Sequence, residues 1–110
     1  MLYFKPVEEN GENIKIIALD GDRELGSCFV RIEAYKCFLS GITADENDAL
    51  LVEGLIRSAL NYAANRGAYI ATCLDDSIKN VLEYLGFENK GGEYQGEIPE
   101  LLKGNCCKSS

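Results

Sequence analysis

The sequence predicts an α+β domain in which an antiparallel β-meander comes first and a helix, a strand, a second helix and a last strand follow. From Ile14 to Ile42 the apolar residues form short β-branched runs separated by turn residues, which is typical of strands. From Ala49 onward they recur at spacings of three and four, which is typical of a helix with one apolar face. The chain has 110 residues, 46% of them hydrophobic and 26% charged. We therefore expect one folded domain over residues 1–110, with a flexible tail at 104–110.

Four short segments rich in β-branched and aromatic residues are predicted to form the meander. Pro6 is expected to end the first of them, and the polar residues 8–13 after it to form a turn or loop. Asp20-Gly21-Asp22 follows the second segment, and its glycine supplies the positive φ that tight hairpin turns require. The predicted strands are residues 2–5, 14–19, 25–33 and 35–42.

A long helix is predicted over residues 49–64, because one apolar stripe runs along one of its faces. Residues 43–46 (TADE) fit a capping box at its start. Asp45, Glu46 and Asp48 place negative charge at the positive end of the helix dipole. At the other end, Arg66-Gly67 is expected to end the helix, with the glycine in the left-handed conformation. The stripe consists of Val52, Leu55, Ile56, Ala59, Leu60 and Ala63.

A buried strand and a second helix are predicted next. Residues 68–74 are apolar and too few for a helix, so they are expected to form a strand. Asp75 or Asp76 would cap the second helix, and Gly86 would end it. Residues 87–110 hold glycines and only brief apolar pieces, which predict one or two strands and a tail. The apolar stripe of the second helix consists of Ile78, Val81, Leu82 and Leu85.

Charge and residue usage argue against several classes of function. The chain has 11 Lys and Arg against 18 Asp and Glu, a net charge of −7 and a pI near 4.5, which disfavours binding to nucleic acid or to an anionic membrane. It has no histidine, the usual activating base of Ser and Cys hydrolases. No segment approaches the roughly 20 apolar residues that a membrane span needs.

The five cysteines are expected to be reduced, in the cytoplasm, because their number is odd and no charged-then-apolar leader precedes the first strand. Cys28, Cys37 and Cys73 lie in apolar, strand-like segments, where a thiol acts as a small buried hydrophobic group. No two cysteines have the Cys-x-x-Cys spacing of a metal site, so no metal is expected. Cys106 and Cys107 are adjacent in the polar tail, and the sequence leaves their role open.

Residues 59–68 (ALNYAANRGA) and 81–88 (VLEYLGFE) stand at the ends of the two predicted helices. Together with the meander they resemble the GNAT superfamily of acyl-CoA N-acyltransferases, over residues 14–88. The resemblance implies a GNAT-like mixed sheet, with the two N-terminal helices of many members reduced or missing. It also implies acetyl-CoA as cofactor and a small amine or a protein as acyl acceptor.

In members that bind acetyl-CoA, a stretch of the pattern Arg/Gln-x-x-Gly-x-Gly/Ala opens the long helix and holds the diphosphate through backbone N–H groups. Counting back from Gly67 places it at residues 47–52, which contain no glycine. Asp45, Glu46 and Asp48 would repel the diphosphate, at about 3 kcal/mol per pair of like charges about 4–6 Å apart. The cofactor positions implied by the resemblance are Leu39, Ile42, Thr43, Asn47, Ala49, Leu50 and Val52, with the thioester against the backbone of residues 39–43.

The family's catalytic tyrosine, which protonates the departing thiolate, has no counterpart at the matching position. Counting back from Gly86 places it at Leu82, which cannot donate a proton, and places a cofactor-contacting asparagine at Asp75. The remaining catalytic candidates are Ser40, on the strand where a base sometimes lies, and Tyr84. Tyr84 lies about 200° around the helix from Leu82 and is expected to be a partly exposed surface residue.

Three hypotheses follow, and whether the chain is an enzyme stays open. The first is a GNAT-like protein in which acetyl-CoA-dependent transfer is weak or lost. The second is a non-catalytic protein-binding or regulatory module that forms a dimer through strand edges or an apolar sheet face. Its acidic surface would attract a basic partner or maintain solubility. The third is another α+β fold, in which the Leu-Gly-Phe ending of the second helix is coincidental.

Overall fold

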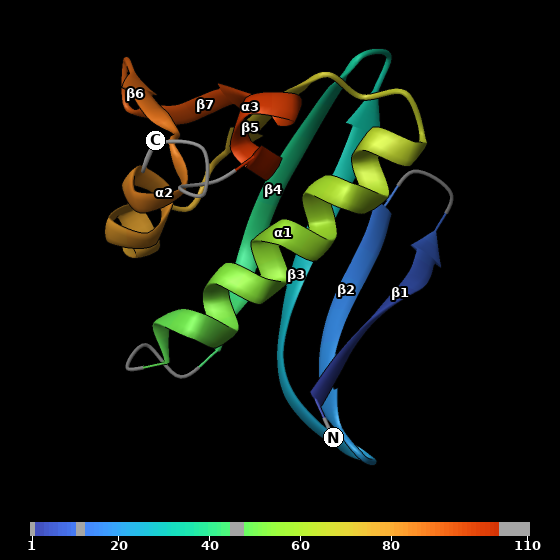
Figure 1. The fold of residues 1–110 in the computed structure, drawn as a ribbon. Coiled ribbons are helices and arrows are strands. Elements are labelled where there is room, and N and C mark those ends of the chain that lie inside the picture. The colour runs from blue at the N-terminus through green and yellow to red at the C-terminus, as the bar shows by residue number, and fades with distance from the viewer. Residues whose placement is uncertain (1, 11–12, 45–47, 104–110) are drawn as a thin grey trace.

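The computed structural model describes residues 2–10, 13–44 and 48–103 (Figure 1). Its centre is a seven-stranded mixed sheet of order β1-β2-β3-β4-β5-β7-β6, accompanied by helices α1 to α3 and a turn of 3-10 helix, η1. The strands are β1 (Leu2–Asn10), β2 (Asn13–Asp20), β3 (Arg23–Glu33), β4 (Lys36–Thr43), β5 (Ile70–Cys73), β6 (Glu88–Lys90) and β7 (Glu93–Glu97). The helices are α1 (Ala49–Asn65), η1 (Asp76–Ile78), α2 (Lys79–Leu85) and α3 (Ile98–Lys103).

Strands β1 to β4 form the predicted antiparallel meander. The turn between β2 and β3 has Gly21 at φ +65°, as a tight hairpin requires. β1 is longer than predicted, because it continues through Pro6, which pairs with Ile16, and takes in residues 8–10 of the predicted loop. The prediction that Pro6 ends this strand is wrong. β1 is an edge strand, where the missing N–H of a proline can face solvent instead of a neighbouring strand.

Helix α1 packs across the meander and buries the whole predicted stripe. Its start differs from the prediction: Thr43 lies in β4, and the N-cap is Asp48, whose carboxylate accepts a hydrogen bond from the Leu51 N–H at 3.0 Å. The predicted capping box at Thr43 is therefore wrong, because the helix begins further along the chain. Residues 45–47 lie outside the described part of the chain. Gly67 follows α1 with φ +94°, as predicted.

The second helix also begins later than predicted. The carboxylate of Asp75 accepts hydrogen bonds from the N–H and the hydroxyl of Ser77, at 3.0 and 2.6 Å. It therefore caps η1, and the N-cap of α2 is Ile78, which makes no side-chain capping bond. The prediction that Asp75 or Asp76 caps the helix is wrong, because η1 intervenes. Gly86 ends α2 in the left-handed conformation, with φ +113°, as predicted.

Residues 87–103 form the predicted strands, as the hairpin β6–β7, and a helix that was not predicted. β7 inserts between β5 and β6, antiparallel to both. In α3, Pro99 occupies the first turn, where its missing N–H costs nothing, and the buried Ile98 and Leu101 anchor the helix. A Cβ at Gly96 of β7 would come within 2.9 Å of the Leu101 side chain, so the glycine lets α3 approach the strand.

All three helices pack on the same face of the sheet (Figure 1). α1 contacts β1 to β4, and Leu101 of α3 lies against Gly96 of β7. The Tyr94 hydroxyl of β7, on this face, donates to the Glu83 carboxylate of α2 at 3.5 Å. Within the described residues no helix covers the opposite face of β1 to β4, which we call the open face. Strand alternation and register assign to it Tyr3, Lys5, Val7, Asn13, Lys15, Ile17, Leu19, Glu24, Ser27, Phe29, Arg31, Glu33, Lys36, Phe38 and Ser40.

Three cysteines belong to the core, as predicted. Cys28, Cys37 and Cys73 are buried and have free thiols. Burial raises the pKa of all three, that of Cys37 to about 12 and that of Cys73 to about 11, from an ordinary value of 9.0. These thiols are therefore neutral at physiological pH and unreactive as nucleophiles.

We expect the free energy of unfolding to fall as the pH rises above about 9. Above that pH an unfolded chain releases thiol protons that the folded chain retains, because the folded pKa values of Cys37 and Cys73 are raised. Each such thiol would lower stability by up to about 1.4 kcal/mol per pH unit between its two pKa values. Urea unfolding at several pH values under a phosphine reductant measures the slope. Cys73→Ala should make it shallower, and an unchanged slope would contradict this assignment.

Candidate functional site

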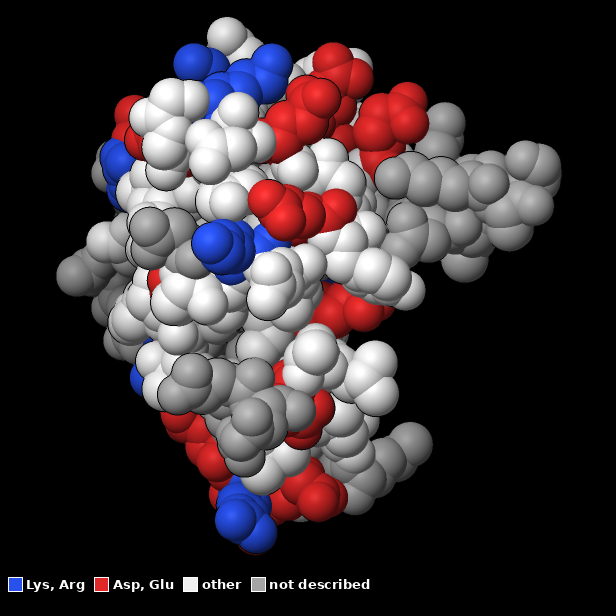
Figure 2. All heavy atoms as spheres, turned by 90° about the vertical axis from the view of Figure 1, so that its left-hand side faces the viewer, with Lys and Arg blue, Asp and Glu red and all other residues white. Residues whose placement is uncertain are grey.

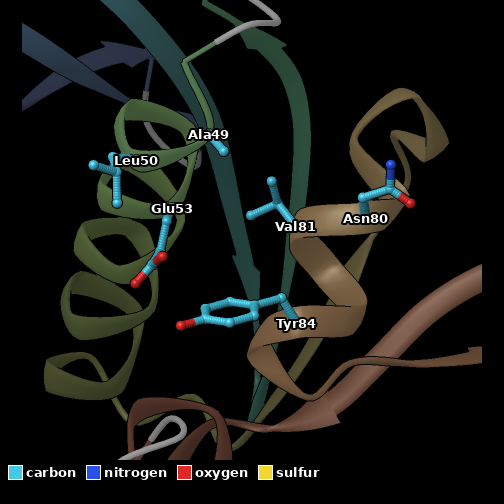
Figure 3. Close-up of a pocket in the computed structure, with 6 residues that line it drawn as sticks. All are labelled: Ala49, Leu50, Glu53, Asn80, Val81 and Tyr84. Carbon is cyan, nitrogen blue, oxygen red and sulfur yellow. The ribbon is translucent and has the colours of Figure 1, made fainter.

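A cleft of about 330 Å³ lies between the first turns of α1 and one side of α2 (Figure 3). Each helix contributes residues at positions i, i+1 and i+4, which lie along one side of a helix. Most of the lining is aliphatic or aromatic, with one carboxylate and one amide among it. The lining residues are Ala49, Leu50 and Glu53 from α1, and Asn80, Val81 and Tyr84 from α2.

The polar groups of the cleft favour a cation over an anion. The Glu53 carboxylate and the Tyr84 hydroxyl point toward one another from α1 and α2 (Figure 3). The carboxylate also accepts a hydrogen bond from Arg57 Nε at 2.8 Å, one turn further along α1. Acidic side chains gather on this side of the molecule (Figure 2). A phosphate entering the cleft would meet a negative potential.

The described start of α1 does not fit the diphosphate of CoA. An anion bound at a helix N-terminus needs backbone N–H groups that point at it and a positive dipole end. Here the Leu51 N–H donates to the Asp48 carboxylate at 3.0 Å, and the Val52 N–H donates to the Asp48 carbonyl at 3.2 Å. A carboxylate of the protein thus holds part of the position that a phosphate would take. Leu50, 80% exposed, projects where close backbone approach would be needed.

Strands β4 and β5 pair in parallel over only part of β4. Lys36 to Leu39 pair with β5, and the Leu74 N–H donates to the Leu39 carbonyl at 2.9 Å. β5 ends at Cys73, whereas β4 runs on to Thr43. Among the described residues, no strand therefore lies beside the last residues of β4 on the β5 side, where the resemblance places a thioester.

Two of the predicted cofactor residues belong to the core. The side chains of Leu39 in β4 and Val52 in α1 are buried among other apolar residues. The Leu39 carbonyl accepts the Leu74 hydrogen bond, and the Val52 N–H lies within the first turn of α1. Any contact of these two residues with a ligand would have to come from the remaining backbone atoms.

Four of the other five predicted cofactor residues lie in two places. Ile42 is half-buried and Thr43 exposed at the end of β4, where the Thr43 hydroxyl donates to the Gly41 carbonyl at 3.4 Å. Ala49 and Leu50 line the cleft. Asn47 lies outside the described residues.

The two catalytic candidates are not brought together. Ser40 pairs with Phe29 in the register and belongs to the open face of β4. Tyr84 lies on α2, on the other side of the sheet, and is 58% exposed in the cleft. Leu82, where the resemblance places a tyrosine, is fully buried, as its place in the apolar stripe predicts.

Three lining residues were not predicted, namely Glu53, Asn80 and Val81. Their place beside the buried stripes is a signal that could have found them: Glu53 follows the buried Val52, and Val81 precedes the buried Leu82. A residue at the border of a stripe faces either solvent or a neighbouring helix, and the sequence does not distinguish these cases.

Among residues 2–10, 13–44 and 48–103 no group of three or more Cys, Asp and Glu side chains could hold a metal ion. None of the helices formed there is long and apolar enough to cross a membrane.

The chain has no match among protein-family models or curated proteins, but many solved structures share its fold. Aminoglycoside 6'-acetyltransferase type Ii superposes with a TM-score of 0.68 over 81% of this chain and 71% of its own, at 17% identity. The aminoglycoside 6'-N-acetyltransferase from Enterococcus faecium gives a TM-score of 0.66 over 81% and 76%, at 16% identity. A GNAT-family N-acetyltransferase from Escherichia coli in complex with CoA gives 0.62 over 83% and 62%, at 15% identity.

These similarities confirm the predicted GNAT-like mixed sheet. At identities of 15–17% they extend to the fold alone. The alternative of another α+β fold is therefore wrong. Within the described residues α1 is the first helix and follows four strands.

Proposed function

We propose that this chain is a GNAT-fold protein in which acetyl-CoA-dependent transfer is weak or lost. The observation that carries the proposal is the start of α1, where the Asp48 carboxylate accepts the Leu51 N–H at 3.0 Å. CoA is the ligand to test, because a structural neighbour from Escherichia coli is in complex with CoA. Its diphosphate would have to displace or approach this carboxylate, and either costs free energy.

Two further features support the same proposal. The buried Leu82 cannot protonate a leaving thiolate, and Tyr84 lies on the opposite side of the sheet from Ser40. Glu53, one turn beyond the Asp48 cap, places a carboxylate in the cleft itself. If transfer survives, positioning against residues 39–43 would supply most of it, and the acceptor would be a small amine or a protein.

Calorimetric titration with acetyl-CoA tests the proposal. The wild-type chain is expected to bind with a Kd weaker than about 1 mM. Asp48→Asn keeps a capping oxygen but removes the charge, so it should bind about tenfold more tightly, a gain of about 1.4 kcal/mol. Glu88→Gln, on the exposed β6, is the matched control and should change nothing. Micromolar binding by the wild-type chain would overturn the proposal.

A second candidate function is a non-catalytic protein-binding module. The observation that favours it is the open face, where partly exposed apolar side chains lie without a covering helix among the described residues. Self-association is one form of this function, and we keep a homodimer as the version to test first. Size-exclusion chromatography with light scattering should then give a dimer mass that does not change with concentration. A monomer at every concentration would exclude self-association.

We further propose that the protein works in the reducing cytoplasm and binds no nucleic acid. The buried, unpaired thiols of Cys28, Cys37 and Cys73 support the first part, because reducing compartments keep thiols free. The net charge of −7 supports the second.

A further inference from the structure

The open face carries apolar side chains that the described residues leave partly exposed. β2 is apolar on both sides: one side is buried under α1, and the other presents the half-buried Ile17 and Leu19. On the neighbouring strands, Phe29 of β3, opposite Lys15, is 38% exposed, and Phe38 of β4, opposite Arg31, is half-buried. Strands that are apolar on both sides are typical of sheets covered on both faces, so these side chains favour a covering partner.

The same face is basic, although the chain as a whole is acidic. Each of its four strands contributes one cation: Lys5, Lys15, Arg31 and Lys36. The acids Glu24 and Glu33 lie toward the two ends, and Glu33 forms an ion pair with Arg31. The net charge of the chain is −7, so this face differs in sign from the rest of the surface.

Two cations lie over aromatic rings in neighbouring rows of the sheet. Lys15 Nζ is 5.8 Å from the centre of the Phe29 ring, and Arg31 Cζ is 4.7 Å from the centre of the Phe38 ring. This stacking holds both cations over the sheet, and on the same side of β2 Lys15 is followed by Ile17 and then Leu19. The result is a surface that presents N–H donors and apolar area together.

We propose that the open face binds an acidic segment of a partner protein that carries apolar side chains among its carboxylates. The proposal rests on the second candidate function and names its surface. The carboxylates pair with Lys15 and Arg31, and the planar guanidinium of Arg31 can donate two parallel hydrogen bonds to one carboxylate. The apolar side chains of the segment cover Ile17 and Leu19. This reverses the expectation, drawn from net charge alone, that the partner is basic.

Two other occupants fit this surface less well. Single-stranded nucleic acid stacks its bases on free aromatic faces. Lys15 lies over the Phe29 ring, and a Cβ at Gly41 would come within 2.8 Å of it, so that ring is already contacted by cation and strand. A second copy docked face to face would oppose like charges, which is costly, so a homodimer would have to form through strand edges instead.

Fluorescence anisotropy with three labelled probes tests the proposal. The first is a synthetic peptide of about 16 residues that repeats Glu-Leu-Glu-Phe, long enough to cross four strands about 4.8 Å apart. The second has lysine in place of every glutamate, and the third is an oligothymidylate of similar length. The wild-type chain is expected to bind only the acidic peptide, with a micromolar Kd.

Two double variants of equal charge locate the binding. Lys15→Glu/Arg31→Glu should weaken binding of the acidic peptide at least tenfold. Lys79→Glu/Lys90→Glu makes the same change of net charge on exposed cations of α2 and β6, and should change the Kd less than about twofold. If far-UV circular dichroism shows that the first variant is unfolded, Lys15→Gln/Arg31→Gln replaces it, with a fivefold weakening expected.

Three outcomes would overturn the proposal, and they separate it from the function on which it rests. Equal weakening by both double variants would leave a module that binds acidic segments, but not through the open face. Preference for the lysine peptide or the oligothymidylate would assign a different partner. No binding of the acidic peptide at about 1 mM would exclude the acidic partner, whereas self-association is decided separately by light scattering.

Discussion

Truncation of Leu82 to alanine is expected to lower the free energy of unfolding by about 3 kcal/mol. α2 (Lys79–Leu85) buries only Leu82 and Leu85, so Leu82 is one of its two anchors in the core. A buried Leu→Ala change loses the transfer free energy of the removed atoms and leaves a cavity, which together cost about 2–5 kcal/mol. Urea unfolding followed by circular dichroism measures the loss.

Tyr84→Ala is the matched control, because it removes a large side chain from the same helix. Tyr84 is 58% exposed, so the expected cost is within about 0.5 kcal/mol. A cost below about 1 kcal/mol for Leu82→Ala would show that Leu82 is not a core residue. A side chain at position 82 could then reach a ligand, as the resemblance implies for a tyrosine there. The proposal that acetyl transfer is weak or lost would lose support.

Leu82 also bears on any attempt to restore activity. Replacing it by tyrosine would place a hydroxyl where the leucine is fully buried, which costs free energy unless the hydroxyl finds a partner. We expect Leu82→Tyr to lower the free energy of unfolding by about 1–3 kcal/mol. It should produce no acetyl transfer to an amine, because the start of α1 is unchanged. Measurable transfer by this variant would contradict the proposal.

Gly26→Ala is expected to cost about 2–3 kcal/mol of unfolding free energy. A Cβ at Gly26 of β3 would lie 2.6 Å from the Thr43 carbonyl oxygen and 3.1 Å from the Ala44 Cβ. The first obstacle is backbone, so it cannot be relieved by rotating a side chain. The change would push the end of β4 away from β3 and loosen the approach to α1. Equilibrium unfolding in urea measures the cost.

Gly54→Ala is the contrasting variant. A Cβ at Gly54 of α1 would lie 2.4 Å from Phe4 Cζ, the far end of a ring on the edge strand β1, which can move. Alanine also favours a helix over glycine by about 1 kcal/mol. We expect Gly54→Ala to cost at least about 1 kcal/mol less than Gly26→Ala. The gain in helix propensity alone accounts for a difference of about that size. If Gly54→Ala cost more than Gly26→Ala, the Phe4 ring would not be free to move and the Thr43 carbonyl would not be the harder obstacle.

Most of the fold could be predicted, because the apolar period and the turn residues are local signals. The strands from Ile14 onward, α1 and the glycine at its end follow from spacing alone. The errors lie at element ends. Pro6 was predicted to end a strand because its edge position was unknown, and Asp48 was passed over as N-cap in favour of a box at Thr43. The helix α3 was missed because its six residues, Ile98–Lys103, are too few to show a period.

The candidate site was predicted only in part. Ala49, Leu50 and Tyr84 line the cleft, but Glu53, Asn80 and Val81 were not among the predicted residues. The acidic start of α1 is visible in the sequence, whereas the hydrogen bond by which Asp48 takes up the Leu51 N–H required the structure. The positive charge of the open face could not be predicted either, because the net charge of a chain says nothing of how its charges are distributed over the surface.

The order of elements, the buried stripes of the helices and the lack of glycine at the start of α1 could all be read from the chain alone. Each depends on residues within a few positions of one another, so spacing contains the information. Which sides of α1 and α2 face each other, and which face of the meander stays uncovered, required the folded molecule. These features bring together residues far apart in the sequence: Glu53 and Tyr84 line one cleft, and Lys15 lies over the Phe29 ring. No local pattern in the sequence records such contacts.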